Sequence, residues 1–77
     1  MSPHLKEQLI GVIDEQLKMN DPLATRETFE RLIGAGHSDT RAKEMIAAVL
    51  VKEMTFMLEN KLPFDEARYA EKLLKLK

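Results

Sequence analysis

The stretch from residue 44 to residue 58, EMIAAVLVKEMTFML, is the feature that most limits what this chain can fold into. Three of its fifteen residues are charged, although 32% of the whole chain is. At about 100° per residue, its apolar side chains cover roughly 240° of a helical circumference, well beyond the ~100° stripe of an ordinary surface helix. The stretch therefore predicts a helix that is enclosed on most sides.

Start and stop signals divide the rest of the chain into further helices. Ser2 before Pro3 favours a cap followed by a first helical residue, and the sequence NDP at 20–22 repeats this pattern. The sequence GAGHS at 34–38 indicates a helix end at Gly36 and a new cap at Ser38. We therefore expect the first three helices to cover residues 3–19, 22–34 and 39–59.

A fourth helix is indicated by the sequence PFDEARY at 63–69. Asp65 is placed to cap it, and Phe64 and Tyr69 have the spacing of a hydrophobic staple. This helix is expected over 66–76, and no period-two alternation predicts a strand. The expected fold is all-α: one domain of residues 1–77, a four-helix orthogonal or bundle-like arrangement with a central apolar third helix.

Two explanations account for the surplus apolar surface of the third helix. Either the other helices wrap it, or part of it packs together with the first helix against a second copy of the chain. A chain of 77 residues gains much from sharing a core, so we expect a homodimer, with another protein as a possible partner. The interface candidates are Leu9, Met54, Phe56 and Met57.

Glu53 is the unusual residue of the apolar stretch because it falls between Leu50 and Met57 on the helical wheel. A lone carboxylate is costly in such surroundings. Glu53 is therefore either a buried acid with a function or a carboxylate that sits at an edge or pairs with a cation. The candidate partners are Arg31, Arg41 and Lys43.

No motif in the sequence indicates a reaction. Cysteine is absent, and no pair of histidines has a metal-binding spacing. An enzyme would need Glu44, Glu53 and His37 in one cleft. We expect no enzyme, no catalytic or cofactor-binding residue, no cofactor and no metal.

Charge and hydropathy bear on partners and location. The net charge of −1 lacks the positive field that gathers nucleic acid or anionic lipid, and the longest apolar run, 45–51, is too short to span a bilayer. The first residues show no secretory signal. We expect neither nucleic acid nor membrane as a partner, and a cytoplasmic location.

Two short resemblances within residues 29–46 remain as alternatives. FERLIGAGHSDTRAKEMI has the outline of a helix-turn-helix that would present Thr40, Arg41 and Lys43 to nucleic acid, although its reading helix is very apolar. AGHSDTRAKEMI also resembles the loop and second helix of ubiquitin-associated domains, with His37 where those domains carry an aromatic residue.

A longer resemblance rests on EQL at 15–17, TFERLIGAGHS at 28–38, IAAVLVKEM at 46–54 and PFDEARY at 63–69. In these segments the chain resembles a family of short, uncharacterised bacterial helical proteins, a domain of unknown function. Members carry histidines where this chain has Lys6, Ile10, Thr40 and Glu44, so a degenerate relative of a metal-binding protein is a further alternative. The expected function is a small interaction or regulatory protein that self-associates.

Overall fold

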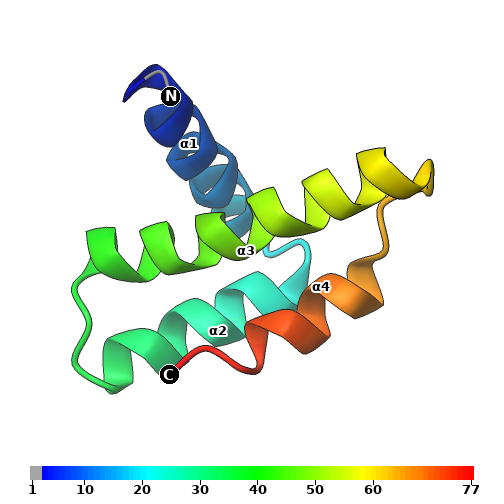
Figure 1. The fold of residues 1–77 in the computed structure, drawn as a ribbon. Helices are drawn as coiled ribbons and strands as arrows, with labels where there is room; N and C mark the ends of the chain where they lie inside the picture. Colours follow the sequence, from blue (N-terminus) through cyan, green and yellow to red (C-terminus); the bar gives the residue numbers. More distant parts are fainter. Residues whose placement is uncertain (1–2) are drawn as a thin grey trace.

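The computed structural model describes residues 3–77, with side chains from Glu7 onward, and over this range the chain forms four helices (Figure 1). They are α1 (Pro3–Met19), α2 (Leu23–Gly34), α3 (Asp39–Asn60) and α4 (Glu66–Leu73). No strand occurs within residues 3–77. The expected all-α class is confirmed, while the proposed cap Ser2 lies outside the described residues.

The longest helix, α3, runs across the molecule and contacts all three others. Figure 1 shows α2 and α4 alongside α3, both running opposite to it, whereas α1 crosses α3 near its middle. The N-terminal half of α1 projects beyond the other helices. The carboxyl-terminal half of α3 likewise extends past the crossing with α1.

The core lies where α3 faces the other helices. Ala42, Ile46 and Leu50 recur every fourth residue on α3, so they lie on one face of that helix, and all three are buried. The complete set of buried hydrophobic residues is Ile13, Leu17, Leu32, Ala42, Ile46, Ala47, Leu50, Tyr69 and Leu73.

The turn between α2 and α3 forms as the sequence predicts. Gly36 has φ of +102°, the left-handed conformation that glycine adopts without a steric penalty. Its N–H donates to the carbonyl of Ile33, and the N–H of His37 donates to that of Leu32, which is the Schellman pattern. The Ser38 hydroxyl then accepts from the N–H of Arg41 at 3.1 Å and caps α3.

The start of α4 also forms as expected. Asp65 accepts a hydrogen bond from the N–H of Arg68 at 3.1 Å. The rings of Phe64 and Tyr69 meet edge to face, with centroids 5.6 Å apart, so the staple is present. Capping and staple together fix where α4 begins relative to the end of α3.

Three of the predicted helix bounds differ from the structure: α2 begins one residue later than expected, α3 ends one residue later, at Asn60, and α4 ends three residues earlier. α2 begins at Leu23 with no side-chain cap, because its N-cap residue is Pro22, whose side chain carries no hydrogen-bond acceptor. The N–H of Asp21 donates to the carbonyl of Gln16, in the turn after α1. α4 ends at Leu73 rather than at residue 76. The guanidinium of Arg31 on α2 donates to the carbonyls of Leu73 and Leu76 and holds the last residues in a turn.

Candidate functional site

Glu53 is buried, with 6% of its surface exposed, and it forms an ion pair. The Nε of Arg68 donates to its Oε2 at 2.7 Å. The three partners named from the sequence were wrong. The guanidinium of Arg31 donates to the carbonyls of Leu73 and Leu76 at the end of the chain's last helix and beyond it. The Nζ of Lys43 lies 2.7 Å from the Oδ1 of Asp14, and Arg41 is exposed near the start of α3. Arg68 reaches Glu53 because α4 packs along α3.

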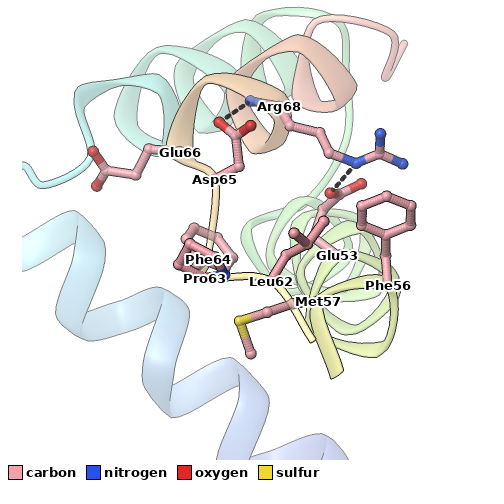
Figure 2. A pocket seen from close by; sticks show the side chains of 9 residues that line it. All are labelled: Glu53, Phe56, Met57, Leu62, Pro63, Phe64, Asp65, Glu66 and Arg68. Carbon is pink, nitrogen blue, oxygen red and sulfur yellow. Dashed lines mark hydrogen bonds and ion pairs between the residues drawn. The ribbon is translucent and has the colours of Figure 1, made fainter. Parts of the chain in front are cut away.

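Arg68 is also held by an aromatic ring. Its guanidinium carbon lies 3.8 Å from the centroid of the Phe56 ring, a cation–π contact at short range. Figure 2 shows the Arg68 guanidinium close to both the Glu53 carboxylate and this ring. We call Glu53, Phe56 and Arg68 the Arg68 cluster. Its three side chains come from α3 and α4 and restrain one another.

An apolar hollow of about 330 Å³ opens beside the Arg68 cluster, between the end of α3 and the start of α4 (Figure 2). Its walls are mostly aromatic and aliphatic, with two carboxylates near the start of α4. Besides the Arg68 cluster, the lining residues are Met57, Leu62, Pro63, Phe64, Asp65 and Glu66.

A second hollow, of about 430 Å³, also includes the Arg68 cluster and has a different character. Its other lining residues are Val49, Lys52, Lys72 and Lys75. Four cationic side chains and one carboxylate therefore line it. We call it the cationic hollow.

The four interface candidates do not share one surface. Leu9 is half-buried and packs against the core, whereas Phe56 and Met57 are half-buried and line the apolar hollow. Met54 is 39% exposed and lies about 160° from Phe56 around α3. Met54 and Met57 are three residues apart and are therefore neighbours on the surface of α3, so of these three residues Phe56 is the one on the other side of the helix.

The exposed apolar residues next to Met54 were not proposed from the sequence. Val51 is 37% exposed and Leu58 is 70% exposed. The three residues follow one another at spacings of three and four, so they lie on one side of α3. On the helical wheel these three residues form one line along the helix. The wheel did not indicate which part of the apolar circumference stays exposed.

Glu44, Glu53 and His37 do not form a cleft. Glu44 and Glu53 are nine residues apart on α3, about 13.5 Å along the helix axis. His37 lies in the turn before α3, and its Nε2 is 3.1 Å from the carbonyl oxygen of Lys77. From residue 7 onward, no three His, Asp or Glu side chains are grouped as a metal ion would require.

A buried polar cluster links α1, α2 and α4. The Oε1 of Gln16 accepts from the hydroxyl of Thr25 at 2.7 Å and from the hydroxyl of Tyr69 at 3.2 Å. Burial raises the pKa of Tyr69 above its usual 10.0, and a hydrogen bond with Thr25 acts in the opposite direction. The folded chain therefore favours the neutral phenol.

This raised pKa predicts a loss of stability in alkali. Above about pH 10 the unfolded chain releases the tyrosine proton while the folded chain keeps it. The stabilisation is complete below that pH and declines as the pH rises, with a slope approaching about 1.4 kcal/mol per pH unit. Urea unfolding at about pH 9 and about pH 11 measures this decline.

The matched variant is Tyr69→Phe, which removes the titrating group from the only tyrosine of the chain. We expect it to cost about 1 kcal/mol at neutral pH, because Gln16 keeps its bond from Thr25. Its stability should fall less between the two alkaline conditions. An equal decline in both proteins would contradict this role for Tyr69.

Comparisons with protein-family models, with curated proteins and with solved structures found no match to this chain. The resemblance to short bacterial helical proteins therefore stays a prediction from the sequence. Within the described residues, no helix combines the length and apolar character that crossing a membrane requires.

Proposed function

We propose that this chain is a small protein–protein interaction module that self-associates through an exposed apolar face of α3. The face consists of Val51, Met54 and Leu58, together with Leu62 just after the helix, and we call it the α3 face. The exposed fractions of these side chains, 37%, 39%, 70% and 50% in that order, are the observation on which the proposal rests.

Position and charge support the choice of this face. It lies on the half of α3 that extends past the crossing with α1 (Figure 1). The five residues from Met54 to Leu58 include no charged side chain, and charged residues are depleted at the centre of protein interfaces. Adjacent apolar residues that stay exposed on a small domain commonly mark an interaction site.

A second copy is the partner that the proposal favours. A two-fold axis would bring the same helical face of both chains together, giving a self-complementary contact that closes after two subunits. Ridges of side chains at spacings of three and four are what helix–helix packing uses. A chain with so small a core would gain stability from the added apolar burial.

The proposal includes no catalysis, because Glu44 and Glu53 are about 13.5 Å apart along α3 and His37 lies in the turn before that helix. It includes no nucleic-acid contact, since Lys43 is already paired with Asp14 at 2.7 Å. A bacterial protein is the setting that the sequence resemblance implies, and a regulatory role is the one that we propose for it.

Leu58→Glu tests the proposal by sedimentation equilibrium over a wide concentration range. We expect a dimer for the wild type and a dissociation constant raised by at least about 30-fold for the variant, because a carboxylate would be desolvated in the contact. Leu74→Glu is the matched control. Leu74, which follows α4, is exposed to 73%, against 70% for Leu58, so the two changes perturb the folded monomer to a similar degree.

Circular dichroism of both variants checks that the helices are kept. A wild type that stays monomeric at every concentration would overturn the proposal. So would equal weakening by Leu58→Glu and Leu74→Glu, because the contact would then not be confined to the α3 face.

A further inference from the structure

The cationic hollow concentrates positive charge in a chain whose net charge is −1. Lys52, Arg68, Lys72 and Lys75 account for four of the twelve basic residues, whereas Glu53 is the one lining residue among thirteen acidic ones. Glu53 is already paired with Arg68. The lining residues thus leave about three positive charges without a carboxylate in the hollow.

This arrangement is unfavourable for the chain alone. Arg68 and Lys72 are four residues apart on α4, where like charges destabilise a helix by about 0.2–0.5 kcal/mol. Lys52 adds a further cation from α3. A bound anion would relieve this repulsion.

Arg68 is held in position for such an anion. Its Nε donates to Glu53, its carbon lies over the ring of Phe56, and Figure 2 shows both terminal nitrogens directed away from the Glu53 carboxylate. Within residues 7–77, these Nη groups donate to no protein acceptor. A guanidinium fixed in this way loses little conformational entropy on binding and offers a planar pair of donors.

We infer that the cationic hollow binds the phosphate group of a small soluble phosphate ester. Phosphate carries about two negative charges at neutral pH and three strong acceptor oxygens, which matches an arginine fork flanked by lysines better than a single carboxylate does. The volume of about 430 Å³ lies within the range of about 300–1,000 Å³ typical of small-molecule sites. Val49 and Phe56 supply apolar surface for the rest of the ligand.

This inference does not depend on self-association. The centre of the α3 face and the centre of the Val49, Lys52 and Phe56 set differ by roughly 160° around α3, so the two surfaces point in nearly opposite directions. Loss of one is therefore expected to leave the other intact.

Titration of the isotope-labelled chain with inorganic pyrophosphate, at constant ionic strength set by chloride, tests the site. We expect saturable shifts of backbone amide signals confined to residues 49–56 and 68–75. The double variant Lys72→Gln and Lys75→Gln should weaken binding by at least about tenfold. It leaves the ion pair of Glu53 and Arg68 in place, so the fold is kept.

The matched control is Lys18→Gln with Lys61→Gln, which removes the same charge from exposed positions outside the hollow and should change affinity by less than about twofold. Shifts that do not saturate, or equal weakening in both double variants, would reduce the effect to general charge attraction and overturn the site. Citrate binding as tightly as pyrophosphate would overturn the assignment to phosphate.

Discussion

Replacing Arg68 by methionine is expected to lower the free energy of unfolding by about 2–3 kcal/mol. Breaking a buried ion pair from one side costs about 3–5 kcal/mol, because a charge is left in the interior without a partner. The side chain of Glu53 is 7% exposed, but that of Arg68 is 37% exposed, and the larger exposure reduces the expected cost. The stacking of Arg68 on Phe56 is lost in the same variant.

Urea unfolding of the wild type, Arg68→Met, Glu53→Leu and the double variant separates the charge from the packing. The double variant should recover most of the loss, since no unpaired carboxylate remains. Lys43→Met is the control because it breaks the more exposed ion pair with Asp14 and should cost less than about 1 kcal/mol. A loss for Arg68→Met no larger than for Lys43→Met would contradict the interior role of Glu53.

Replacing Ile46 by alanine is expected to cost about 3 kcal/mol. Ile46 is fully buried between α3 and the other helices, and removing three carbons there leaves a cavity as well as losing apolar burial. A chain of 77 residues has roughly 4–12 kcal/mol of stability in total. This one change should therefore lower the urea midpoint severely.

Met54→Ala on the same helix gives the comparison. Met54 is 39% exposed, so in the monomer its truncation should cost less than about 1 kcal/mol. Both variants are measured at concentrations low enough to keep the chain monomeric. Equal losses of unfolding free energy for Ile46→Ala and Met54→Ala would mean that α3 is enclosed on both sides. That result would contradict the exposure of the α3 face.

Local chemistry made most of the helix boundaries predictable. Ser38, Asp65 and Gly36 each act within three or four residues of their own position, and each forms the expected cap or turn. The end of α4 was not predictable in this way. It depends on Arg31, which is 42 residues from Leu73 in the sequence and meets it only in the folded chain.

The candidate site was predictable in part. The position of Glu53 between Leu50 and Met57 on the wheel pointed to burial, and the residue is buried. Its partner Arg68 was missed because the pairing requires α4 to fold back along α3, which helical spacing does not encode. Of the α3 face, only Met54 was named from the sequence, for a related reason: an apolar circumference of roughly 240° does not indicate which side the other helices cover.

The central claim, that Met54 and Leu58 meet a second copy of the chain, is tested most directly by isotope-filtered nuclear Overhauser spectroscopy on a mixture of labelled and unlabelled chains. We expect contacts between chains from the methyl groups of Met54 and Leu58, at concentrations where sedimentation shows the dimer. Intermolecular contacts only from other surfaces, such as Leu74, or none at all, would contradict it.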